Sequence, residues 1–296
     1  MAATEALPDL DSLRLLVLVG DLGSIGAAAG AAGISQPSAS KRIRLLEHSL
    51  GVALLDRDRQ GSRLTDHGRT ITDWARAVVG AAHTLVVGAR ALRSDARSRL
   101  ATAASQTVAE YLFPHWLATL SHRDRQLSVS LRVLNSAGVI ELVRDHAVEL
   151  GFIESPGVPR DLASRVVAVD RLVVVVGPSH PWARRRRALV MTDLASALLV
   201  VREGGSGTRA TLERAIGPLP EGHLELDSNA AVKIVVAGGR GAAVLSTLAV
   251  AGELADGRLV EVPVDADALD LRRQLRAVWP RGQRLIGAAA EFLAIT

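Results

Sequence analysis

A chain of 296 residues with 48% hydrophobic and 22% charged residues can bury the core of one large or two ordinary globular domains. The lack of cysteine excludes disulfides and thiolate metal sites, and no apolar run approaches the roughly 18 residues of a membrane span. The net charge of +4 is too small to identify a nucleic-acid partner by itself.

The first nine residues contain Glu5 and Asp9 but no basic residue, so they lack the charged start of a signal peptide. We therefore expect a soluble, cytoplasmic protein without a membrane partner. Helical spacing of leucine and valine from Leu10 predicts a helix that ends near residues 20–23. A small, alanine-rich helix follows over residues 24–32, and Gly33 permits a tight turn. A third helix opens at residues 35–37, which completes a helix-turn-helix within residues 1–66.

The third helix divides into two faces. Its apolar residues repeat at helical spacing and are predicted to pack inward: Ala39, Ile43, Leu46 and Leu50. The opposite face is polar and basic: Pro37, Ser38, Lys41, Arg44 and His48. Such a face suits a helix in the DNA major groove, although an ordinary solvated helix has the same periodicity. Residues 54–65 then read as two short strands around Gly61, a hairpin wing with arginines at its tip that can grip phosphates.

This pattern extends from residue 23 to residue 68. It includes the motifs Gly-Ile-Ser-Gln-Pro-Ser-Ala-Ser-Lys-Arg-Ile-Arg-Leu-Leu-Glu (residues 33–47) and Leu-Leu-Asp-Arg (residues 54–57). In order and spacing the stretch resembles the DNA-binding signature of LysR-type transcriptional regulators. The resemblance implies that the recognition helix and wing touch a double-stranded operator, with these DNA-binding residues: Ser24, Ser35, Gln36, Pro37, Ser38, Ser40, Lys41, Arg42, Arg44, Arg57 and Arg63. Small residues at positions 30–32, where the family has bulkier ones, predict a weaker second helix because glycine costs about 1 kcal/mol relative to alanine.

Residues 66–93 predict a long helix with an apolar stripe that includes Trp74, Val78 and Leu85. The resemblance implies that this linker helix, with a polar hinge at residues 94–98, forms a homodimer or homotetramer. The linker is accordingly placed at residues 67–98 and an effector-binding domain at residues 99–296. Lobe I of that domain is expected over about residues 99–168 and 268–296, and lobe II over about residues 169–267.

The remainder alternates strands and helices, as an α/β domain does. Strands are predicted at residues 100–104, 127–134, 150–153, 198–201 and 242–245, with one or two more within 166–176. Helices are predicted at residues 110–120 and 139–145. This part resembles the two-lobed, periplasmic-binding-protein-like effector domain of the same family, with crossovers near residues 166–170 and 262–271.

Four strand-to-helix junctions in this domain carry polar residues where a ligand would lie. The predicted effector-binding residues are Ser105, Gln106, Thr107, Asn135, Ser136, Arg202, Ser206, Thr208, Ser228 and Asn229. Each junction alone is better explained by a helix cap, but four together favour a shared polar site. The segment at residues 202–209 has three glycines for close backbone approach, with Arg202 and Arg209 to neutralise an anion. We therefore predict a small anionic metabolite as effector.

Enzymatic alternatives find little support in the sequence. The glycine-rich segment has no Walker lysine, no Gly-x-Ser-x-Gly elbow occurs, and the eight histidines lack metal-ligand spacing. No catalytic residue, metal or cofactor is therefore predicted. A stand-alone solute-binding protein is opposed by the missing signal peptide and by the first 90 residues. The sequence predicts a DNA-binding transcriptional regulator whose operator binding an effector modulates.

Overall fold

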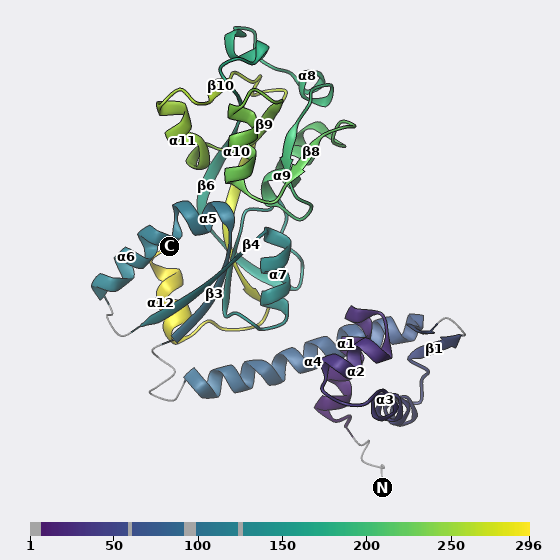
Figure 1. Ribbon diagram of the computed structural model, residues 1–296. Helices are drawn as coiled ribbons and strands as arrows, with labels where there is room; N and C mark the ends of the chain where they lie inside the picture. Colours follow the sequence, from purple (N-terminus) through teal and green to yellow (C-terminus); the bar gives the residue numbers. More distant parts are fainter. Residues whose placement is uncertain (1–6, 59–60, 92–98, 124–126) are drawn as a thin grey trace. The chain divides into compact units, whose positions relative to one another are not determined.

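The computed structural model describes residues 7–58, 61–91, 99–123 and 127–296 and divides into two compact units, Met1–Arg90 and Ala91–Thr296 (Figure 1). Each unit has a hydrophobic core of its own. Among the residues that the structure describes, no helix is both long and apolar enough to cross a membrane.

The first unit begins with three helices: α1 (Leu10–Leu22), α2 (Ile25–Ala31) and α3 (Gln36–Leu50). The Ser24 hydroxyl caps α2 by accepting a hydrogen bond from the Ala27 amide at 3.1 Å, which supports a helix of only seven residues. Ile43 on α3 is fully buried against α1 and α2. The expected inward face of the third helix is confirmed by its buried residues, so the opposite face is free for solvent or a partner.

The predicted wing is a two-stranded antiparallel hairpin of β1 (Leu55–Asp58) and β2 (Gly61–Leu64). One carboxylate oxygen of Glu47, on α3, accepts hydrogen bonds from the backbone amides of Leu54 and Leu55 at 2.9 and 3.1 Å. These bonds fix the root of the hairpin to α3, so the wing and this helix form one rigid surface.

The long helix α4 (Asp66–Ala91) starts directly after the wing. At Gly68 an added Cβ would lie 2.1 Å from the Leu54 carbonyl oxygen, so only glycine allows the helix to approach the wing this closely. Further along, Trp74 and Leu85 are 63% and 75% exposed. The expected apolar stripe is thus without cover in the single chain. The hinge predicted at residues 94–98 lies outside the described residues.

Lobe I of the second unit is an α/β layer with sheet order β6-β11-β5-β3-β4. Its elements are β3 (Arg99–Ser105), α5 (Gln106–Tyr111), α6 (Phe113–Arg123), β4 (Ser128–Leu134), α7 (Ser136–Arg144), β5 (Leu150–Ile153), β6 (Leu162–Val176), β11 (Arg272–Pro280) and α12 (Gly287–Ala294). Four aromatic rings form the centre of its core: Phe113, Trp116, Phe152 and Phe292.

Strand β6 runs through both lobes. Residues 162–171 pair with β11, whereas Leu172–Val176 pair with β9, and the last three of these also pair with β10. Lobe II contains the second half of β6 together with η2 (Pro181–Arg184), α8 (Met191–Ala195), β7 (Val200–Arg202), α9 (Gly207–Ile216), β8 (Leu224–Leu226), α10 (Asn229–Ala237), β9 (Ala242–Ser246), α11 (Thr247–Ala255) and β10 (Val260–Val262). A single 15-residue strand therefore makes the first crossover between lobes.

Three sequence expectations need correction. The helix predicted over residues 110–120 is two helices, α5 and α6, because the chain turns at Leu112. The helix predicted from residue 139 begins earlier, at Ser136, where Asn135 caps it. Leu269 and Leu271, both expected in lobe I at the end of the second crossover, pack into the core of lobe II. The second crossover therefore lies at the entry to β11.

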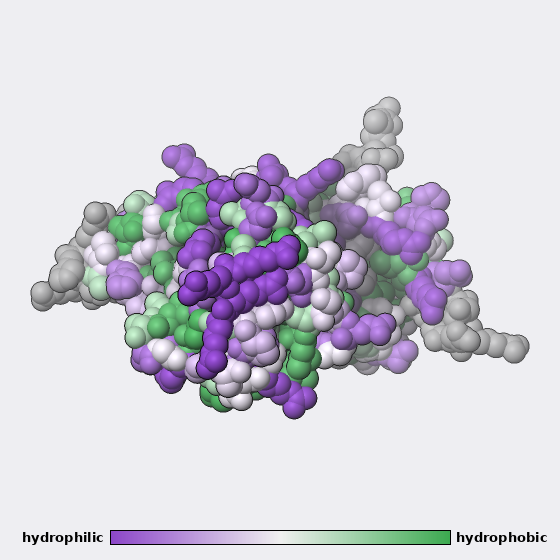
Figure 2. Space-filling model, turned by 90° about the horizontal axis from the view of Figure 1, so that it is seen from above, coloured by the Kyte–Doolittle hydropathy of each residue, from purple (hydrophilic) through white to green (hydrophobic). Residues whose placement is uncertain are grey.

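Figure 2 looks down on the end of lobe II that carries η2 and α8, and hydrophilic side chains form a band across this face. Arg184, Arg186 and Arg187 are exposed at this end, while Arg185 is partly buried and pairs with Asp193 at 2.9 Å. A backbone hydrogen bond from Val190, together with the bond from Arg185, lowers the pKa of the Asp193 carboxyl. Leu189 and Leu194 pack into the lobe core, whereas Met191 is exposed.

Candidate DNA interface and effector site

The outer face of α3 presents polar and basic side chains to solvent. Ser35, at the N-cap of α3, accepts a hydrogen bond from the Ser38 amide at 3.4 Å, and Pro37 occupies the first turn. Among the predicted DNA-contacting residues, these are exposed: Ser35, Gln36, Pro37, Ser38, Lys41 and Arg44. Ser24, Ser40 and Arg42 are half-buried. The structure thus exposes a polar face along α3 that includes the basic residues Lys41 and Arg44, and the major groove of B-DNA admits an α-helix.

The basic residues of this unit differ in their engagement. Arg42 lies 3.7 Å from a carboxylate oxygen of Asp11, and Arg44 donates to the Ser40 carbonyl at 3.3 Å. Arg63, on β2, is exposed. The side chain of Arg57 lies outside the described part of the chain. Exposed pairs such as Arg42–Asp11 contribute little to stability, so they do not prevent contact with phosphate.

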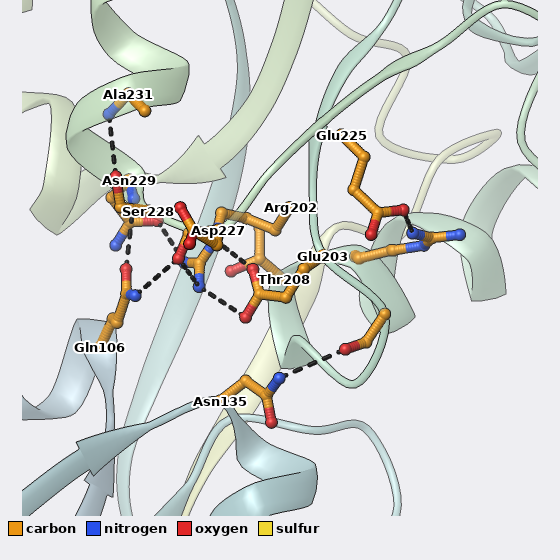
Figure 3. A network of polar contacts seen from close by, with 12 residues as sticks. Gln106, Asn135, Arg202, Glu203, Thr208, Glu225, Asp227, Ser228, Asn229 and Ala231 are labelled. Atoms are coloured by element: carbon orange, nitrogen blue, oxygen red, sulfur yellow. Dashed lines mark hydrogen bonds and ion pairs between the residues drawn. The ribbon is translucent and has the colours of Figure 1, made fainter.

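Two of the four polar junctions in the second unit are helix caps. The Asn135 side-chain oxygen accepts a hydrogen bond from the Gly138 amide at 2.9 Å. The Ser228 hydroxyl accepts one from the Ala231 amide at 3.1 Å (Figure 3). The Ser136 hydroxyl is also engaged, because it accepts a hydrogen bond from the Glu154 amide at 3.1 Å. These groups have structural partners, as the cap interpretation requires.

The other two junctions differ. Ser105 stands at the N-cap of α5 in lobe I and Ser206 at the N-cap of α9 in lobe II, yet neither side chain makes a capping hydrogen bond. Both serines are at least 98% buried, and both hydroxyls lack a partner among the described residues. The Asn229 side-chain nitrogen is buried without a partner as well. An unmade hydrogen bond at a buried polar group costs about 1–3 kcal/mol, so three such groups need an explanation.

Arg202 does not offer a free charge. Its guanidinium is 2% exposed and forms two bonds with the adjacent Glu203 carboxylate, at 2.8 and 3.0 Å (Figure 3). It also donates to the Asn229 side-chain oxygen at 2.8 Å and to the Asp227 carbonyl. Arg209 is likewise paired, with Glu213 and Glu225, and its hydrogen bond lowers the pKa of the Glu225 carboxyl. The expectation that these two arginines neutralise a bound anion is corrected, because the carboxylates of neighbouring glutamates already balance their charges.

Several predicted effector residues instead join the lobes to each other. The Gln106 side chain, on α5 of lobe I, donates to the Asp227 carbonyl at 2.9 Å and accepts from the Asn229 amide at 3.2 Å (Figure 3). The Asn135 side chain of lobe I donates to the Gly204 carbonyl of lobe II at 3.2 Å. We call these two contacts between the lobes, one through Gln106 and one through Asn135, the latches.

The glycine-rich segment approaches protein rather than open space. An added Cβ at Gly207 would lie 2.6 Å from two atoms of Glu154 and 2.7 Å from the Ser155 nitrogen, in lobe I. At Gly205, an added Cβ would lie 2.9 Å from the Ala137 methyl group. At Gly204, by contrast, it would meet nothing within 4 Å. Two of the three glycines are therefore required by the close contact between lobes.

A buried cluster around Arg273 was missed by the sequence analysis. Its guanidinium, on β11, bonds the Asp170 carboxylate of β6 at 2.7 and 2.8 Å. It also donates to Thr208 of lobe II at 2.9 Å and to Thr107 of lobe I at 3.2 Å. Arg273 and Asp170 are paired directly across the two crossover strands. The cluster thus ties both lobes to the hinge between them.

A signal for Arg273 exists in the sequence. In β11, buried positions alternate with exposed ones, and Leu271, Arg273, Leu275 and Ala277 share the inward phase. A charged residue on the inward phase of a strand requires a buried partner. The position could therefore have been identified, although not its partner.

Among the described residues, no group of three or more acidic or histidine side chains could hold a metal ion.

The fold and these sites define a bacterial-type regulator with a winged helix-turn-helix and a two-lobed α/β ligand domain. Residues 10–69 match the family model "Bacterial regulatory helix-turn-helix protein, lysR family", and residues 93–296 match the model "LysR substrate binding domain". The chain belongs to the LysR family of transcriptional regulators. The resemblance and fold class inferred from the sequence are confirmed. The prediction that the protein is not an enzyme is confirmed too, because the family and its members are regulators.

Relatives resemble the chain over nearly its full length. An uncharacterized HTH-type transcriptional regulator of Mycobacterium tuberculosis is 41% identical over 295 residues, 96% of this chain and 94% of the relative. The RuBisCO operon transcriptional regulator of Allochromatium vinosum is 30% identical over 286 residues, 96% and 93% of the two chains. Among solved structures, the Synechocystis PCC6803 CcmR regulatory domain in complex with 2-PG is 28% identical, with a TM-score of 0.59, and covers 67% of this chain and 94% of that one.

Proposed function

We propose that this regulator binds an operator duplex through α3 and the β1–β2 wing, and that a small anionic metabolite bound between lobes I and II changes this binding. The exposed polar and basic face of α3 supports the DNA half of the proposal. The wing root fixed by Glu47 supports a paired contact of helix and hairpin. Lys41 and Arg42 are the proposed base-reading residues, and Arg57 and Arg63 contact phosphates.

One observation carries the effector half. Ser105 and Ser206 come from opposite lobes, and each has a buried hydroxyl without a partner among the described residues. A ligand that hydrogen-bonds both would satisfy two costly groups at once. The first amides of α9, which follow Ser206, favour negative charge. That the CcmR regulatory domain was solved with 2-PG supports a small ligand in the corresponding domain.

Oligomerisation completes the proposal. Trp74, Val78 and Leu85 recur along α4, and each is about half exposed or more. An apolar stripe of this kind on a helix of 26 residues suits pairing with a second copy of the same helix. We infer a homodimer or homotetramer in which α4 joins subunits.

The test is a gel-shift titration with the full-length protein, the DNA upstream of its own gene, and a panel of metabolite anions. The double variant Ser105→Ala/Ser206→Ala should retain operator affinity but lose the effector response. It should fold at least as stably as wild type, since it breaks no hydrogen bond within the described residues. Ser136→Ala is the matched control: its hydroxyl has a structural partner, so it should lose stability and keep the response. A full response in the double variant would move the effector site elsewhere.

A further inference from the structure

The cluster around Arg273 contains two carboxylates, those of Asp170 and Glu154, on a single guanidinium. Asp170 uses both oxygens: one accepts a hydrogen bond from the Ser246 hydroxyl at 2.9 Å, and the other pairs with Arg273. Glu154 lies on the same guanidinium but is held less well. Its nearer contact to Arg273 is 3.4 Å, and that oxygen accepts no hydrogen bond from the described residues. Glu154 is nevertheless only 2% exposed.

The surplus is not compensated nearby. Among the described residues the other buried guanidinium, that of Arg202 in lobe II, is already matched by Glu203. The two buried guanidinium groups are thus paired with three carboxylates, those of Glu203, Glu154 and Asp170. A buried carboxylate with an unmet oxygen is costly unless a donor reaches it. Both arginines have acceptors, whereas one carboxylate oxygen of Glu154 lacks a hydrogen-bond donor among the described residues.

Glu154 adjoins the N-terminus of α9. The close approach of Gly207 to the backbone of Glu154 and Ser155 places this carboxylate next to the first turn of that helix. One of its oxygens accepts a hydrogen bond from Thr208 at 3.3 Å, in the same turn. The unpartnered hydroxyl of Ser206 immediately precedes Gly207. An anionic group bound at Ser206 would therefore have the Glu154 carboxylate as a close neighbour of like charge.

We propose that Glu154 determines effector class: the effector carries a hydrogen-bond donor, an ammonium or hydroxyl group, beside its anionic group. The anionic group lies at Ser105 and Ser206, and the donor binds the unmet oxygen of Glu154. Simple oxyanions that offer only acceptors are repelled by this carboxylate. This inference rests on the proposed function, because it assumes that the effector binds between the lobes.

The experiment measures ligand binding to the full-length protein by calorimetry, without DNA. Alanine and propionate share a carboxylate and a three-carbon skeleton, but only alanine carries an ammonium group. Wild type should bind alanine more tightly than propionate, and Glu154→Gln should reduce this preference about tenfold, since a charge-assisted bond becomes a neutral one. Glu154→Ala, which removes both oxygens, gives the same reading if the glutamine variant folds poorly.

Asp170→Asn is the matched control, because it removes one negative charge from the same guanidinium at a carboxylate whose oxygens are both bonded. It should lower stability and keep the preference for alanine. Equal affinities for the two acids in wild type, undetectable binding included, would overturn the inference, as would a preference that Glu154→Gln and Glu154→Ala leave unchanged. Failure of the proposed function is distinguishable, since it appears as an operator affinity that no metabolite alters.

Discussion

Replacing Gly207 by alanine tests whether the glycine-rich segment serves contact between the lobes. Gly207 is the first residue of α9, and alanine there would stabilise a free helix by up to about 1 kcal/mol. The added Cβ would, however, lie 2.6 Å from two Glu154 atoms and 2.7 Å from the Ser155 nitrogen. Ordinary contacts between carbon atoms are about 3.5–4.0 Å, so lobe I must shift by about 1 Å relative to α9. Overpacking of this kind costs about 1–3 kcal/mol and outweighs the helix propensity.

The assay is denaturant unfolding of the full-length protein, followed by tryptophan fluorescence, because three of its four tryptophans lie in the second unit. Gly204→Ala is the control within the same segment, since an added Cβ there meets nothing within 4 Å. We expect Gly207→Ala to lower the free energy of unfolding by about 1–3 kcal/mol and Gly204→Ala to change it by less than about 0.5 kcal/mol. If the two variants were equally stable, the steric argument would be refuted.

Two further predictions concern DNA binding and assembly. Lys41→Ala and Arg42→Ala should each weaken specific operator binding by about 1–3 kcal/mol. Arg63→Ala should instead weaken binding to all sequences and reduce the slope of log affinity against log salt concentration by about one unit. Unchanged gel-shift affinity in the Lys41/Arg42 double variant would refute the assignment of α3 as recognition helix. Trp74→Glu should shift the protein toward monomers in light scattering, because a charge would enter an apolar contact, and a wild type that is already monomeric at micromolar concentration would contradict this.

Local sequence signals predicted the first unit well. Ser24 caps the second helix, and Gly33 adopts positive φ after it, where the tight turn was expected. These features depend on a few neighbouring residues, which is why the sequence reveals them. The helix that was expected to be weak, α2, is nevertheless formed, because Ile25 is buried in the core of the unit and its cap is satisfied.

Which buried charges of the second unit are already paired was harder to predict. Arg202 appeared as a free cation in the sequence, but its partners include Asn229, which is 27 residues away. The pairing of Arg273 with Asp170 spans 103 residues and depends on the register of two crossover strands. Long-range partners decide whether a buried charge is available to a ligand, and neither periodicity nor motif spacing encodes them. The hydrogen-bond donor proposed for the effector could therefore be argued only after the partners were known.

The latches between the lobes set what an effector must do. Gln106 and Asn135 hold lobe II against lobe I in this structure, and a neutral hydrogen bond contributes about 0.5–1.5 kcal/mol. A ligand shifts such an equilibrium only by its differential affinity, and about 1.4 kcal/mol corresponds to a tenfold change. An effector that bonds Ser105 and Ser206 together adds its contacts to the latched arrangement and stabilises it. One that must separate these serines to enter breaks latch bonds of comparable strength and favours the open arrangement. The size of the effector, as well as its charge, therefore decides which arrangement of the lobes it favours.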